Sequence, residues 1–187
     1  SDLRDNEMEL SDKIQQGLQH DVLLLSGGVS MGEKDLVPAL LHQAHVQEVF
    51  HKVQLKPGKP LWFGQAEGRQ QRTLVFGLPG NPVSSLVCYI LFVAPLIRAY
   101  QQGTRGIDIQ PDSCAELTAP YTLRGHRPTY HPGRLDWISG KWSVTPLPWS
   151  GSADQQALAQ ANCLAFFQPP QREYDIGQQI SVLPFLW

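Results

Sequence analysis

The stretch Thr73-Leu-Val-Phe-Gly-Leu-Pro-Gly-Asn-Pro-Val-Ser-Ser85 decides how the first half of this chain folds. Its β-type residues run into a Gly-Leu-Pro-Gly corner. A helix is predicted to open at Asn81 and Pro82, because asparagine is a favoured N-cap and proline is tolerated at the first helical position. A helix that starts where a strand ends directs free backbone N–H groups and the positive end of its dipole into one crevice, which suits an anion. The alternative is a tight strand–turn–helix corner without a ligand.

A second corner of the same kind lies earlier in the chain. The apolar run Asp21–Leu25 is typical of a strand buried on both faces, and it breaks at the glycine-bearing segment Ser26–Asp35 before a helical pattern begins. Glycine lets a backbone approach a bulky ligand closely. Two such loops after two strands lie side by side at the carboxyl edge of a parallel sheet, where open α/β folds bind ligands. Neither loop matches the GxGxxG or GxxxxGK[ST] nucleotide fingerprints.

Composition limits the class of protein. The 187 residues are 42% hydrophobic and 17% charged, as in a globular protein, and the formal net charge of −2 argues against a general nucleic-acid binder. We see no apolar run approaching the ~20 residues of a membrane span and no signal-peptide pattern, so we expect no membrane span and a cytoplasmic location. Three widely spread cysteines suit free thiols in a reducing compartment.

The pattern of expected helices and strands changes near residue 104. The first half alternates helices and strands, which predicts a three-layer α/β domain over residues 1–104. The expected elements are helix 5–19, strand 21–26, helix 35–45, strands near 47–55, 61–64 and 73–77, and helix 81–102, kinked at Pro95. Because no strand precedes the first helix, we expect this domain to be incomplete at its amino end and the chain to be part of a longer protein.

The second half, residues 105–187, predicts a small β-barrel or sandwich domain. Its short strand-like runs are punctuated by proline, glycine and serine, and only residues 153–161 look helical. The expected strands begin at Cys114, Leu135, Trp142, Cys163 and Gln179.

A lysine-rich segment, Phe50–Pro60, separates the two corners in sequence. On an extended strand Lys52, Gln54 and Lys56 share a face, and the two lysines leave it about 13 Å apart. That separation suits an extended polyanion that contacts both lysines. The alternative is edge lysines that keep a strand soluble, and Lys59 reads equally well as a solvated loop charge.

Two carboxylates, Asp5 and Asp35, accompany the corners. A carboxylate pair beside a phosphate site is the usual way in which proteins hold Mg²⁺. Both residues also stand where a helix opens, so N-capping is an alternative that accounts for them fully.

Taken together, these segments resemble the MoeA/gephyrin family, the molybdopterin molybdenumtransferases. The resemblance rests on Ser26–Asp35, on Lys52–Pro60 and on Gly77–Ser84, in that order and spacing, and it covers the whole chain. It implies a partial molybdopterin-binding domain followed by the terminal β-barrel domain of the family. It also implies insertion of molybdate into adenylylated molybdopterin with Mg²⁺ and release of AMP, a homodimer, and a fragment that is incomplete for catalysis.

The resemblance assigns roles to particular residues. Asp35, Lys52 and Lys56 correspond to catalytic positions, and Asp5 with Asp35 to metal positions. Substrate binding is expected at Ser26, Gly27, Gly28, Ser30, Gly58, Pro79, Gly80, Asn81 and Ser152. The family commonly has an arginine where this chain has Pro132, and Arg134 stands two residues further on. The alternatives to the transferase are the related molybdopterin adenylyltransferase and a non-catalytic, gephyrin-like scaffold or binding module.

Overall fold

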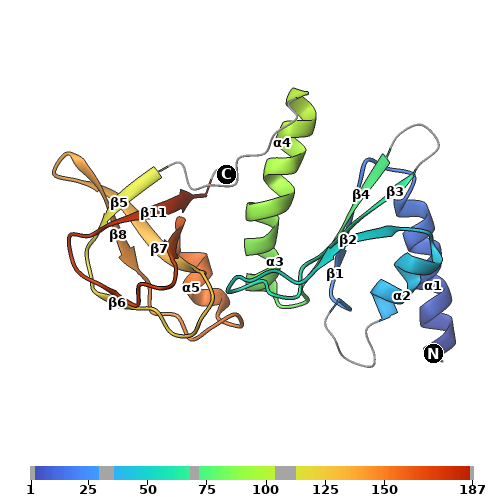
Figure 1. Cartoon of the computed structure of the whole chain (residues 1–187), viewed down its shortest axis with the longest axis horizontal. Helices are drawn as coiled ribbons and strands as arrows, with labels where there is room; N and C mark the ends of the chain where they lie inside the picture. The colour runs from blue at the N-terminus through green and yellow to red at the C-terminus, as the bar shows by residue number, and fades with distance from the viewer. Residues whose placement is uncertain (1–2, 30–35, 68–71, 104–112, 186–187) are drawn as a thin grey trace. The chain divides into compact units, whose positions relative to one another are not determined.

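The computed structural model describes residues 3–29, 36–67, 72–103 and 113–185, with side chains of the first helix described from Glu7 onward. The chain divides into two compact units (Figure 1). The first contains the residues up to Val53 and Gly58–Tyr89, and the second contains Gln54–Pro57 and the chain from Ile90 onward. The domain boundary predicted between residues 104 and 105 lies outside the described residues and stays a prediction.

The first unit is an α/β domain around a mixed four-stranded sheet of order β1-β4-β3-β2. Strand β1 runs parallel to β4, whereas β3 pairs antiparallel with both β4 and β2. The elements are α1 (Leu3–Gly17), β1 (Val22–Ser26), α2 (Leu36–Gln43), β2 (Gln47–His51), β3 (Trp62–Glu67), β4 (Arg72–Leu78) and α3 (Pro82–Cys88). This order confirms the predicted alternation of helices and strands.

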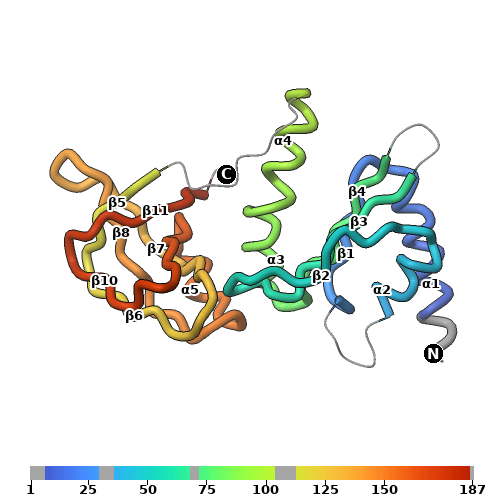
Figure 2. The backbone as a smooth tube through the Cα atoms, viewed as in Figure 1, coloured from blue at the N-terminus to red at the C-terminus, as the bar shows by residue number. Residues whose placement is uncertain are grey.

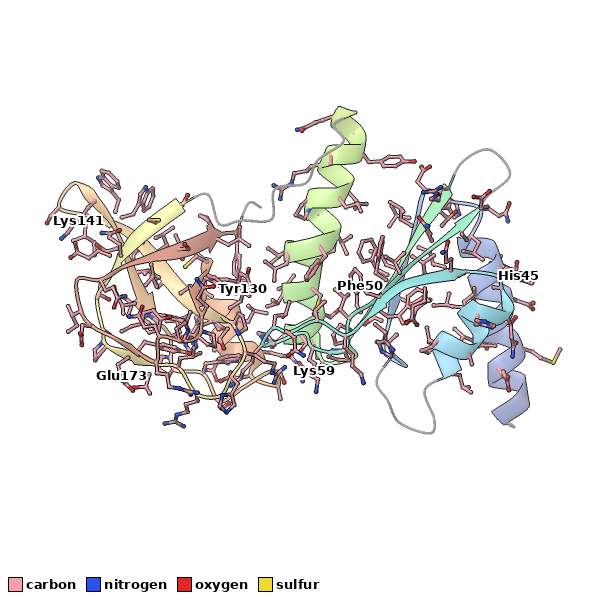
Figure 3. The ribbon with its side chains drawn as sticks, viewed as in Figure 1. His45, Phe50, Lys59, Tyr130, Lys141 and Glu173 are labelled. Atoms are coloured by element: carbon pink, nitrogen blue, oxygen red, sulfur yellow. The ribbon has the colours of Figure 1, made fainter. Side chains whose placement is uncertain are left out.

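Both faces of this sheet are covered. Helices α1 and α2 lie on one face (Figure 1), where Ile14, Leu41, Trp62 and Val75 form a buried core. The other face carries a ladder of phenylalanines from three neighbouring strands, with ring centroids 5.4 and 4.7 Å apart between successive rings. Figure 3 shows Phe50 of this ladder on the side away from α1 and α2. Helix α3 contacts β4, so the unit is the predicted three-layer α/β domain.

The expected helix over 81–102 consists of three segments. A π-helical turn, η1 (Tyr89–Val93), separates α3 from α4 (Ala94–Gln102), and Gly103 ends the run in the left-handed conformation with φ 65°. Proline has no N–H and disrupts the regular hydrogen-bond ladder, which explains an irregular turn immediately before Pro95. The expected break at this proline is therefore observed as a π-helical turn.

The same run corrects one expectation from the sequence. The 21 residues Pro82–Gln102 are long and apolar enough to cross a membrane by length and composition alone. Core helices of soluble proteins pass the same test, so one such helix is weak evidence for a membrane span. The amino-terminal part of the run buries Val83 and Val87 completely within the α/β unit.

The second unit contains the predicted β-barrel, a closed sheet of order β11-β5-β8-β7-β9. Its buried core includes Leu117, Val144, Phe167 and Val182. Strands β6 and β10 pair separately (Figure 2). The elements are β5 (Ser113–Leu117), β6 (Tyr121–Thr122), β7 (Thr129–Ile138), β8 (Lys141–Pro146), α5 (Gln155–Gln160), β9 (Cys163–Phe167), β10 (Glu173–Tyr174) and β11 (Gln179–Pro184).

Candidate functional site

The two glycine-bearing corners lie at the same edge of the α/β sheet. Strands β1 and β4 are parallel neighbours whose register pairs Ser26 with Leu78, the last residue of each strand. Beyond that pair the backbone N–H of Gly27 donates a hydrogen bond of 3.0 Å to the carbonyl of Leu78. The sequence prediction that the two corners lie side by side at the carboxyl ends of their strands is confirmed for the described residues.

The contact between the corners depends on glycine at two positions. A Cβ atom on Gly80 would lie 3.2 Å from the Cα of Gly27, and a Cβ on Gly27 would lie 3.8 Å from the Cα of Gly80. Gly27 also adopts φ 88° and Gly28 φ 67°, where L-residues with side chains are strained. Glycine at these positions therefore lets the two backbones approach closely at the sheet edge.

The second corner ends in a polar group without a partner. Pro79 is buried, and Asn81 precedes helix α3 with extended φ and ψ of −74° and 122°. Its side chain makes no capping hydrogen bond, and its Oδ1 is buried without a partner. Buried polar atoms are normally hydrogen-bonded, so this unpaired oxygen calls for an explanation. The predicted N-cap position is confirmed, but the side chain does not cap the helix.

The lysine segment does not follow the predicted extended strand. Strand β2 ends at His51, and Lys52 takes the left-handed conformation with φ 76°. The chain then turns back, because Lys52 N–H donates to the Leu61 carbonyl at 2.7 Å and Val53 N–H donates to the Lys59 carbonyl at 2.9 Å. The expected strand over 47–55, with Lys52, Gln54 and Lys56 on one face, is therefore wrong.

Part of this segment does reach the first corner. His51 Nε2 lies 2.9 Å from the carbonyl oxygen of Val29, so the residue before Lys52 is anchored to the loop that follows β1. Gly58 is buried with φ 116°, and its carbonyl accepts from Leu61 N–H. Within the α/β unit, the segments that contain Gly27, Lys52 and Gly80 accordingly gather at one edge of the sheet.

Lys56 belongs to the barrel unit. Its N–H donates to the Pro128 carbonyl at 2.9 Å, and its own carbonyl accepts from Tyr130 N–H at 2.8 Å, which adds this residue beside β7. Its ammonium group lies 5.5 Å from the centre of the Trp149 ring. The two lysines expected to act as a pair therefore stand on different units.

The barrel unit also holds the other expected anion contacts. Ser152 is half-buried in the turn before α5. Pro132, which stands in the place of the family arginine, is buried in β7. Arg134 is mostly exposed, and its Nε lies 3.5 Å from a carboxylate oxygen of Asp136. Arg134 is thus already engaged with a carboxylate on its own strand.

Three expected site residues lie outside what the structure describes. Ser30 and Asp35 fall within the undescribed residues 30–35, and Asp5 lies in α1 where side chains are not described. Among the described residues no group of three or more histidine, cysteine, aspartate or glutamate side chains could hold a metal ion. The roles of Asp5 and Asp35 stay predictions.

Sequence reasoning did not single out His51 beside the sheet edge, or His131 and Trp149 in the barrel unit. His131 Nε2 lies 2.8 Å from the Leu147 carbonyl oxygen, and the His131 and Trp149 rings meet edge to face at 5.1 Å. Burial lowers the pKa of His131. No local pattern marks any of the three, since each acts through a contact with a residue distant in sequence or on another element.

Comparisons with known proteins agree with this architecture. A family model described as a probable molybdopterin binding domain matches residues 2–99, and one described as the MoeA C-terminal region (domain IV) matches residues 114–185. The fold and site thus define a molybdopterin-binding α/β domain followed by a terminal barrel domain. The chain belongs to the MoeA/gephyrin family of molybdopterin molybdenumtransferases.

Individual relatives cover almost the whole chain. A molybdopterin molybdenumtransferase of Haemophilus influenzae is 33% identical over 98% of this chain and 44% of its own length. A gephyrin of Dictyostelium discoideum is 36% identical over 87% of this chain and 25% of its own length. A solved MoeA protein of Pyrococcus horikoshii superposes with a TM-score of 0.71 at 23% identity, over 97% of this chain and 41% of its own. The chain therefore spans less than half the length of these relatives.

Proposed function

We propose that this chain is the carboxyl-terminal part of a molybdopterin molybdenumtransferase, which inserts molybdate into adenylylated molybdopterin and releases AMP. The observation that carries the proposal is the edge where Gly27 and Gly80 approach each other next to the unpartnered Asn81 Oδ1. Relatives that bear the name of this enzyme support it. We place the protein in the cytoplasm and infer a homodimer, as the family resemblance implies.

The proposed substrate carries a phosphate and a pterin, and molybdate adds a second anion. The backbone N–H groups at the start of α3 suit the phosphate, and Asn81 offers a hydrogen-bonding group to the pterin. The charge of Lys52, in the α/β unit, suits the departing AMP phosphate, and that of Lys56, in the barrel unit, suits an oxyanion such as molybdate. No covalent protein nucleophile is required, because holding two reactants together supplies much of the acceleration.

In this proposal Mg²⁺ would be held by Asp5 and Asp35, the two carboxylates that the family resemblance assigns to the metal. When bound, Mg²⁺ would neutralise phosphate charge and orient the leaving group. Isothermal titration of the chain with MgCl₂ alone tests the assignment directly. We expect Asp35→Asn to remove Mg²⁺ binding, and undiminished binding in that variant would remove Asp35 from the site.

The reaction itself is tested by measuring AMP release from adenylylated molybdopterin in the presence of molybdate. We expect release by the longer parent protein and binding without turnover by this chain alone. In parallel, molybdopterin is titrated against the wild-type chain and against Lys56→Ala. Equal affinities would remove Lys56 from the binding site, and absence of AMP release by the parent protein would overturn the proposed activity.

Two alternatives rest on specific observations. The α/β unit suits a molybdopterin adenylyltransferase, but the attached barrel that matches the MoeA C-terminal region counts against it. ATP-dependent formation of adenylylated molybdopterin would favour it. A scaffold role is favoured by similarity to a gephyrin. Capture of a membrane-receptor peptide by a chain that fails to bind molybdopterin would support that role.

A further inference from the structure

The barrel unit contains a buried hydrogen-bond donor without an acceptor. Three buried side-chain atoms among the described residues lack a partner, and two of them, His131 Nδ1 and Trp149 Nε1, belong to rings in edge-to-face contact. A buried N–H without a partner is destabilising. Such groups in native proteins call for an explanation, of which an absent guest is one.

The backbone on both sides of Trp149 is held in place. On one side Leu147 N–H donates to the Pro132 carbonyl at 3.0 Å. On the other side Ser150 N–H donates to a carboxylate oxygen of Asp154 at 3.0 Å. The backbone around the indole is thus held in place, and no acceptor among the described residues pairs with the indole N–H.

A cation accompanies this donor. Lys56 Nζ lies 5.5 Å from the centre of the Trp149 ring, and both residues belong to the barrel unit. Neither ion pair recorded among the described residues involves Lys56; they join Arg134 to Asp136 and Lys141 to Glu116. A fixed neutral donor and an ammonium group without a carboxylate partner together suit the oxygens of one anion.

His131 contributes packing and not a further donor. The Leu147 carbonyl can only accept, so the hydrogen bond at His131 Nε2 places the ring proton there and leaves Nδ1 as an acceptor. Burial lowers the pKa of His131, and the nearby charge of Lys56 acts in the same direction. The imidazole therefore stays neutral and holds the indole edge in position.

We propose that Trp149 is an oxyanion-binding residue, whose Nε1–H acts together with Lys56 Nζ on one tetrahedral oxyanion group. The proposal deepens the proposed function, because molybdate and the substrate phosphate are both tetrahedral oxyanions. Arg134 takes no part, since it is exposed and engaged with Asp136.

The test follows the indole N–H itself by two-dimensional ¹H–¹⁵N NMR of the whole chain labelled at its five tryptophans. The Trp149 signal is assigned as the one that disappears in Trp149→Phe. Sodium molybdate and sodium phosphate are then titrated separately, with sodium chloride at matched ionic strength. We expect a saturable shift of the Trp149 signal with at least one oxyanion and none with chloride.

Lysine variants supply the matched comparison. Lys56→Met keeps the apolar stem and removes the charge, and we expect it to weaken the oxyanion affinity about tenfold or more. Lys141→Met removes an exposed lysine on the hairpin between β7 and β8 (Figure 3), and we expect no change. A signal that moves with phosphate alone would assign the site to the substrate phosphate and not to molybdate.

Two results would overturn the proposal. One is a Trp149 signal that neither oxyanion moves, as expected if the indole N–H holds only water. The other is a shift that Lys56→Met leaves unchanged. Because simple oxyanions are the probes, either result is independent of whether the chain binds a pterin, and loss of pterin binding would leave the oxyanion site intact.

Discussion

The packing between the loop after β1 and the end of β4 leads to a quantitative prediction for Gly77→Ala. Gly77 is buried, and a Cβ atom there would lie 2.5 Å from Val29 Cγ1 and 3.1 Å from Trp62 Cβ. Val29 and Trp62 are 1% and 2% exposed, so neither can move into solvent. Overpacking of this kind typically costs about 1–3 kcal/mol. We expect Gly77→Ala to lower the unfolding free energy of the α/β unit by that amount.

The partner substitution is Val29→Ala, which removes the clashing methyl group. Alone it deletes two buried methyl groups, at about 0.8 kcal/mol each, and leaves a cavity, for a total of about 2 kcal/mol. In the Gly77→Ala protein it also relieves the clash, and the new methyl group occupies part of the cavity. We therefore expect the double variant to be about 1–3 kcal/mol more stable than the sum of the single effects.

Native-state hydrogen exchange of the β1 and β4 amides measures these free energies for the α/β unit alone. Val46→Ala is the matched control, because Val46 is 4% exposed in the same core but is not among the atoms nearest to the added methyl group. The changes in unfolding free energy caused by Gly77→Ala and Val46→Ala should add in the double variant. If Gly77→Ala and Val29→Ala also add to within about 0.5 kcal/mol, the loop does not pack on the strand end as described.

Burial raises the pKa of both Cys88 and Cys163 to about 12, whereas Cys114 is exposed. We therefore expect a thiol reagent at neutral pH to label one cysteine rapidly in the folded chain and none rapidly in Cys114→Ser; two rapid equivalents in the wild type would contradict the burial of the others. The lowered pKa of His131 means that the unfolded chain binds a proton that the folded chain lacks, so stability should be fully present above the ordinary pKa near 6.5 and fall as pH drops below it. His131→Gln, which can still donate to Leu147, should lose that part of the pH dependence in urea titrations between about pH 5 and 7.5, and identical pH profiles would refute the assignment.

The sequence predicted those parts of the structure in which local chemistry and tertiary contacts agree. The run Asp21–Leu25 is apolar enough to specify a strand, and Asn81 with Pro82 specifies a helix start whatever surrounds it. These features predict that both glycine corners lie at one edge of the sheet. The predicted burial of the Asp21–Leu25 strand on both faces is wrong, because β1 lies at the edge of the sheet and Leu24 is 42% exposed.

The course of the lysine segment could not be predicted, because distant partners determine it. Alternating residues around Lys52 and Lys56 favour an extended strand, but pairing of Lys52 with Leu61 turns the chain and pairing of Lys56 with Pro128 and Tyr130 attaches it to the barrel. The first half of β7 was missed for a related reason. His131, Pro132 and Gly133 read as a break in a strand, yet all three are buried in one.

Some residues of the candidate site could be predicted from the sequence, and others could not. Glycine and proline positions follow from backbone requirements that are visible in the sequence, and the structure places Gly27, Gly80 and Asn81 together. Trp149 could not be found in the same way, because an unpaired buried N–H is a property of the whole environment of a side chain. Tryptophan in a loop otherwise indicates only a large apolar contact.

The central claim is that the two corners form one binding edge for an anionic pterin, and Asn81→Asp tests it most directly. Aspartate has nearly the same shape and is an equally good N-cap, so the fold should be kept, while a negative charge enters beside the expected phosphate. Equilibrium titration with molybdopterin should show wild-type binding and at least a tenfold loss in Asn81→Asp, with unfolding measured in parallel to show that the variant is folded under the titration conditions. Equal affinity of the two proteins for molybdopterin, or no binding by either, would contradict the account.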